Sequence, residues 1–176
     1  MGLFATIPVD EVTVQDIATV VGVTPAAVYY HFASKEQILI DGMQRFRDDL
    51  LDRVRTLADT PQMAVGDLVA ELLGWVSRRR VPGLVYFVSS IGLNLMIEAV
   101  RRDGRQDMVE VLRPVVSAAR GRTSRAEAGV IAVALVSLLE TALASMLNGD
   151  VSYLGLGARS FPAEVGRLAN RIAGAA

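Results

Sequence analysis

Side chains that could do covalent or metal chemistry are almost missing from this sequence of 176 amino acids. It contains no cysteine, and His31 is its single histidine. A disulfide, a thiolate metal site and a cysteine nucleophile are therefore excluded, and a histidine-based metal site or Ser-His-Asp triad is disfavoured. We expect a protein that is not an enzyme, with no catalytic residue, no metal ligand and no cofactor.

A different kind of chemistry is concentrated around the histidine. Residues 24–35 combine small side chains with aromatic hydroxyls, the imidazole and the only lysine of the chain. Alanines can contact thymine methyl groups, and tyrosine and histidine can bond to phosphates or base edges, so this mixture suits the major groove of double-stranded DNA. The candidate contact residues are Thr13, Thr24, Pro25, Ala26, Ala27, Tyr29, Tyr30, His31 and Lys35.

Two short helices must position these residues. Thr13 and Asp16 form a variant of the capping box that begins the first helix, and Gly22 ends it. Thr24 then begins the second helix as its N-cap, with Pro25 at the first helical position. The two-residue turn between the helices forces a sharp crossing, which is the geometry of a helix-turn-helix.

The remainder of the chain carries helical signals and no convincing strand. Full capping boxes at Ser34 and Ser124 predict the starts of two long helices. Thr60-Pro61 predicts a further helix start, and Asp103-Gly104 predicts a turn between two helices. The sequence therefore indicates an all-α protein, with an N-terminal helix-turn-helix followed by a helical bundle.

Residues 13–36 resemble the DNA-binding signature of TetR-family transcriptional regulators. The blocks that match at the family's spacing are Thr13-Val14-Gln15-Asp16-Ile17-Ala18, Gly22-Val23-Thr24, Tyr29-Tyr30-His31-Phe32 and Ser34-Lys35-Glu36. Leu3-Phe4-Ala5 matches only the end of the helix that precedes this signature in the family. We therefore expect the chain to begin inside that first helix.

This resemblance implies two domains and a mode of action. Residues 1–45 would be the DNA-binding domain, N-terminally incomplete, and residues 46–176 a helical effector-binding and dimerisation domain. The protein would be a cytoplasmic homodimer that binds a palindromic operator and responds to a small, apolar effector. Repression is expected because most members of the family are repressors.

The effector would enter a largely apolar cavity with few polar groups. Aromatic residues at helical spacing and polar residues inside apolar runs are the candidates, and both patterns also occur in an ordinary core or at a solvent-facing position. The candidate residues are Trp75, Tyr86, Phe87, Asn94 and Glu140. The many small residues in 124–147 and 162–173 predict close helix packing, either between subunits, as the resemblance implies, or within one.

Composition and charge limit these expectations. Apolar residues make up 52% of the chain and the net charge is −1, which excludes a disordered chain and a globally basic nucleic-acid binder. Residues 1–50 hold three basic and seven acidic residues, which gives 3 − 7 = −4. Since phosphate contacts supply much of the affinity for DNA, an alternative stays open: a ligand-binding and dimerisation module that has lost DNA binding through its incomplete first helix.

Two long apolar runs raise the question of a membrane span. The first, residues 81–97, has 17 residues, fewer than the roughly 20 that a span requires. The second, residues 128–147, carries Glu140 within it. We expect both runs to be buried helices and no membrane partner.

Overall fold

The computed structural model describes residues 1–150, 155–157 and 160–174, and all regular structure in these ranges is helical. The elements are α1 (Gly2–Thr6), α2 (Val14–Val21), α3 (Pro25–His31), α4 (Lys35–Ala58), α5 (Val65–Ser77), α6 (Arg80–Leu84), the π-helical turn η1 (Val85–Ser89), α7 (Leu95–Arg120), α8 (Arg125–Asn148) and α9 (Ser160–Ala173). The predicted all-α class is confirmed.

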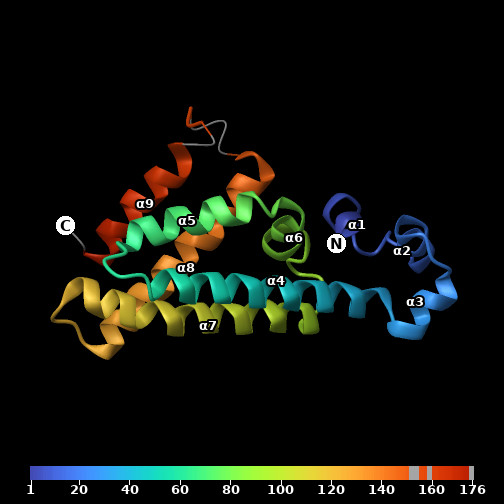
Figure 1. Ribbon diagram of the computed structural model, residues 1–176, viewed down its shortest axis with the longest axis horizontal. Helices are drawn as coiled ribbons and strands as arrows, with labels where there is room; N and C mark the ends of the chain where they lie inside the picture. The colour runs from blue at the N-terminus through green and yellow to red at the C-terminus, as the bar shows by residue number, and fades with distance from the viewer. Residues whose placement is uncertain (151–154, 158–159, 175–176) are drawn as a thin grey trace.

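Two long helices, α4 and α7, lie side by side along the molecule (Figure 1). Helices α1 to α3 form a head at one end of α4, and α5, α8 and α9 pack in the other half of the molecule. Buried apolar residues from Leu39 to Leu57 line one side of α4 and join the main core. Helix α4 continues without a break through residue 45, so the head and the bundle share one helix.

Side-chain caps begin five of the described helices. In each, an oxygen of the N-cap side chain accepts a hydrogen bond from a backbone N–H three residues later. The caps are Thr13, Thr24, Ser34, Asn94 and Ser124. Such a cap depends on a few consecutive residues, and four of these five were predicted from the sequence.

The predicted full capping boxes at Ser34 and Ser124 are only half formed. The amide of Gln37 donates to Asp41, 2.7 Å away, and Glu127 pairs with Arg120 at 3.2 Å, so neither side chain bonds to the backbone N–H of its N-cap residue. Gln37 bonds instead to a residue one turn later in α4, and Glu127 pairs instead with a residue of α7.

Two predicted helix boundaries are wrong. Gly104 lies buried inside α7, where a Cβ would sit 2.4 Å from the hydroxyl oxygen of Tyr86. The missing side chain therefore permits close packing and does not make a turn. Thr60 does not cap a helix either, because its hydroxyl donates to the carbonyl of Thr56 at 2.9 Å and α5 begins only at Val65.

Helices α5 and α9 cross at two glycines. A Cβ on Gly66 would lie 2.3 Å from the backbone oxygen of Gly166, and the N–H of Gly66 donates to the side-chain oxygen of Asn170 at 2.6 Å. Ala169 and Ala173 of α9 are also fully buried. Gly166 therefore packs against α5, and Ala169 and Ala173 are covered by helices of the same subunit.

Helix α8 is the most apolar element. By length and composition it could cross a membrane, yet 39% of its most apolar stretch is already buried within the protein. Core helices of globular proteins meet the same criterion. Residues such as Leu135 and Leu139 pack inside, whereas Val130 is 70% exposed and Val133 is 45% exposed. The helix thus presents apolar residues on both its inner and its outer side.

Candidate nucleic-acid interface

Helices α2 and α3 cross through the short turn at Gly22. This residue has a φ of 73°, in the left-handed region that glycine adopts without strain. The N–H of Val23 donates to the carbonyl of Ala18 at 3.0 Å and closes the turn. Ala18 is completely buried, so its small side chain lets α3 approach closely. The predicted helix-turn-helix is therefore present.

Helix α3 has one side buried in the protein and the other exposed to solvent. Val28 is buried, whereas Tyr29 is 58% and Tyr30 84% exposed. Of the other predicted contact residues, Thr24, Ala26 and His31 are exposed, and Pro25 and Ala27 are partly exposed. One helix thus gathers these residues on an accessible surface, which we call the α3 surface.

The two exposed tyrosines provide hydroxyl groups on the α3 surface that are available for hydrogen bonds. Their hydroxyls have no hydrogen-bond partner among the residues that the structure describes. The rings of Tyr30 and His31 meet edge to face with centroids 5.0 Å apart. This contact orients two groups that can bond to phosphates or bases without using their polar atoms.

The two threonines of the predicted set act within the protein as caps. Thr24 accepts a bond from the N–H of Ala27 at 3.2 Å. Thr13 accepts from the N–H of Asp16 at 3.1 Å and donates to its carboxylate at 2.5 Å. Hydrogen bonds from the side chain and the backbone of Thr13 lower the pKa of Asp16.

Lys35 has an internal role that the sequence did not reveal. Its ammonium donates to the carbonyl of Asp10 at 2.8 Å and to that of Val12 at 2.7 Å. It therefore ties the start of α4 to the loop before α2. An ammonium has three donors, so one remains for another partner.

The charge of the head is the feature least typical of a DNA-binding surface. Within residues 1–41, Lys35 is the single basic side chain, against the acidic residues Asp10, Glu11, Asp16, Glu36 and Asp41. The α3 surface itself carries no acidic residue. Its contacts to DNA would therefore depend on hydrogen bonds and shape more than on charge.

The aromatic residues predicted to bind an effector lie together in the core. Trp75, Tyr86 and Phe87 surround Phe46 of α4, with ring centroids 5.8, 5.5 and 6.1 Å from it. All are buried, and burial raises the pKa of Tyr86 to about 12. The structure brings these three together; whether they also contact an effector stays a prediction.

The two polar candidates have partners within the chain. Asn94 caps α7 by accepting from the N–H of Ile97 at 3.0 Å. Glu140 of α8 pairs with Arg105 of α7, which also donates to Ser137. Burial raises the pKa of Glu140, and the nearby Arg105 opposes this shift. The charge of Glu140 also contributes to the raised pKa of Tyr86, so this carboxylate lies near the aromatic group around Phe46.

Comparison with known proteins agrees with this geometry. Residues 1–41 match the model of "Bacterial regulatory proteins, tetR family". A TetR transcriptional regulator from Legionella pneumophila has a similar structure, with a TM-score of 0.71 and 16% identity over 94% of this chain and 90% of that one. A tetR-family transcriptional regulator from Streptomyces coelicolor gives 0.73 and 19% over 97% and 75%. The search of curated proteins found no match.

Proposed function

We propose that this chain, whose head matches the tetR family and whose fold is that of TetR-family regulators, controls transcription by inserting α3 into the major groove of DNA. The observation that carries the proposal is the α3 surface. It is an exposed, acid-free helix side with small and aromatic residues, presented by a helix-turn-helix. Such a helix fits the major groove and can read base edges there.

Within this proposal the contacts divide by type. Ala26 and Ala27 would contact bases, while Tyr29, Tyr30 and His31 would bond to phosphates or base edges. The hydroxyls of Thr13 and Thr24 already cap helices, so these residues would act mainly by holding the helix starts in place. Lys35 would position the head and offer its remaining donor to a phosphate.

A homodimer would place two heads on a palindromic operator. The outer side of α8 supports this, because it exposes Val130 and Val133 on a helix that is apolar on its inner side as well. Apolar residues of this kind are stabilised when a second copy covers them. Ala142 is buried within the subunit and does not belong to this outer surface.

An apolar effector that releases the protein from DNA would make it a repressor acting in the cytoplasm. The residues predicted from the sequence to bind that effector are Trp75, Tyr86, Phe87, Asn94 and Glu140, and the three aromatic residues among these pack around Phe46 in the core. Because the aromatic rings pack on one another, binding there would require them to separate. We propose no catalytic step, cofactor or metal for this chain.

The acidic head supports a second candidate, a ligand-binding and dimerisation module without DNA binding. Selection of genomic DNA fragments with the purified protein, followed by anisotropy titrations at several salt concentrations, separates the two. If the protein is a DNA-binding regulator, one palindromic sequence should be enriched, and the protein should bind it more tightly than a scrambled duplex. Equal, weak binding to all sequences would contradict the regulator and favour the module.

A further inference from the structure

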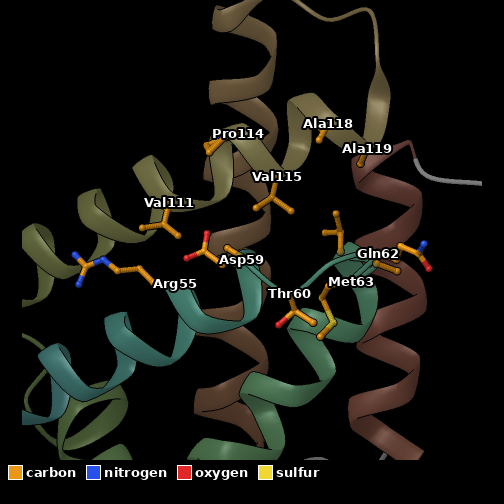
Figure 2. Close-up of a pocket in the computed structure, with 13 residues that line it drawn as sticks. Arg55, Asp59, Thr60, Gln62, Met63, Val111, Pro114, Val115, Ala118 and Ala119 are labelled. Carbon is orange, nitrogen blue, oxygen red and sulfur yellow. The ribbon is translucent and has the colours of Figure 1, made fainter.

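A cavity of about 770 Å³ lies at the end of the bundle opposite the head, away from the aromatic core. It is formed where the end of α4 and the following loop face the second half of α7 (Figure 2). Its volume lies within the range of small-molecule sites, roughly 300–1,000 Å³. Neither the head nor any of the predicted effector residues lines it.

The walls of this cavity are mainly apolar. Val111, Pro114 and Val115 come from α7, and Met63 and Val65 come from the chain around the start of α5. Small alanines on α4 and α7 complete the walls. Such a lining favours an apolar molecule, because contact removes apolar surface of both partners from water.

One carboxylate at the cavity lacks a partner. Asp59 is the exposed residue that follows α4 as its C-cap, and its side chain has no hydrogen bond or ion pair among the described residues. In Figure 2 this carboxylate lies beside Val111 and Val115, between α4 and α7. Its position adds to the negative end of the α4 dipole, which strengthens the attraction for a cation.

The other polar lining groups do not neutralise Asp59. Arg55 forms an ion pair with Asp52 at 3.0 Å, and its guanidinium points away from the other lining residues in Figure 2. The hydroxyl of Thr60 donates to the carbonyl of Thr56. The cavity thus combines apolar walls with one free negative charge.

We propose that this cavity binds an organic cation with an apolar body and an ammonium group placed against Asp59. The ammonium would donate to the carboxylate while the apolar body lies on the α7 wall. As an effector site the cavity rests on the proposed regulatory function, whereas binding itself does not depend on DNA.

Three small molecules with one skeleton test the proposal directly. Calorimetric titration of the purified protein, without DNA, compares 4-phenylbutylamine, 4-phenylbutanol and 4-phenylbutyrate, which are cationic, neutral and anionic at pH 7. The amine is expected to bind most tightly and the acid most weakly. An exposed ion pair of this kind is worth up to about a fivefold difference in affinity. Equal binding of amine and acid, or no binding of the amine, would overturn the proposal.

Three variants locate the binding. Asp59→Asn keeps the shape of the side chain and should remove the preference for the amine over the alcohol. Asp49→Asn is the matched control, because Asp49 is an exposed aspartate like Asp59 but lies within α4 and does not line the cavity. Val115→Phe should weaken all three ligands by filling the cavity. An unchanged amine preference in Asp59→Asn would place the binding elsewhere.

Tyr30→Ala separates this proposal from the regulatory one. It should leave amine binding unchanged, since Tyr30 lies in the head and not at the cavity. If the protein binds the amine but no operator, the organic-cation site is supported and the proposed regulatory function is contradicted. If it binds an operator but not the amine, the regulatory function is supported and the organic-cation site is contradicted.

Discussion

The ammonium of Lys35, at the first residue of α4, donates to the backbone carbonyl of Val12, 2.7 Å away on the loop before α2. A second bond of 2.8 Å to the carbonyl of Asp10 fixes the same loop. The residue thus links the helix that runs through the bundle to the segment that begins the helix-turn-helix. Any effect of Lys35 on DNA binding must include this internal role.

Replacing Lys35 should therefore disturb the head even without DNA. Lys35→Ala removes both bonds and leaves two carbonyls to water, which should lower the free energy of unfolding by about 1 kcal/mol. Urea denaturation followed by circular dichroism measures this. Lys35→Arg should recover part of the loss, because a guanidinium can still donate. A fully stable Lys35→Ala variant that binds DNA more weakly would instead support a role confined to the phosphate.

The most exposed tyrosine separates DNA contact from folding. Tyr30→Ala should change the free energy of unfolding by less than about 0.5 kcal/mol, because its ring is 84% exposed. The same change should weaken specific operator binding several-fold in an anisotropy titration. Leu95→Ala is a matched control, since Leu95 is 90% exposed on α7, outside the head. Equal effects of the two variants on DNA affinity would contradict the α3 surface.

The contact between Tyr86 and Gly104 predicts coupled mutations. Gly104→Ala should destabilise the protein although alanine favours helices, since its Cβ would lie 2.4 Å from the Tyr86 hydroxyl oxygen. Tyr86→Phe should raise the free energy of unfolding by about 1 kcal/mol, because the buried hydroxyl lacks a hydrogen-bond partner in the described structure. The double variant with Gly104→Ala and Tyr86→Phe should have a higher free energy of unfolding than the sum of the two separate changes predicts. If the changes in the free energy of unfolding simply add in a double-mutant cycle measured by denaturation, the steric contact between Tyr86 and Gly104 is ruled out.

Glu140 should make stability depend on pH in a defined direction. Burial raises its pKa in the folded protein, so the folded state holds a proton that the unfolded state releases. Stability contributed by this group is therefore complete below its unfolded pKa and decreases as pH rises through the folded pKa. Glu140→Gln cannot ionise and should lose less stability than the wild type as pH rises from the ordinary glutamate range. Parallel stability curves for the two proteins would disprove this.

The outer side of α8 predicts a change in oligomeric state. Val130→Glu places a charge on a residue that is 70% exposed in the single subunit, so the subunit should still fold. If a second copy covers this surface, the charge would be buried there, and sedimentation velocity should show a shift from dimer to monomer. Ala142→Glu serves as a contrast, because Ala142 is buried within the subunit and its replacement should unfold the chain. A wild-type sedimentation profile for Val130→Glu would remove this side of α8 from the interface.

The sequence predicted the features that depend on neighbouring residues. Thr13 and Thr24 cap helices as expected, and Gly22 adopts the left-handed conformation that ends α2. These outcomes follow from hydrogen bonds and steric limits within a few residues of chain. For the same reason the helix-turn-helix, the exposure of Tyr30 and the all-α class could be predicted without a structure.

Only the tertiary structure decided which distant groups meet. A glycine next to an aspartate is typical of a turn, yet Gly104 lies inside α7, and Tyr86 from another element occupies the space where its side chain would be. Lys35 pairs with carbonyls more than twenty residues earlier, and Asp59 reaches the α7 wall without a partner. Such contacts depend on how the helices cross, and that crossing is determined by the packing of the whole core and not by any short stretch of sequence.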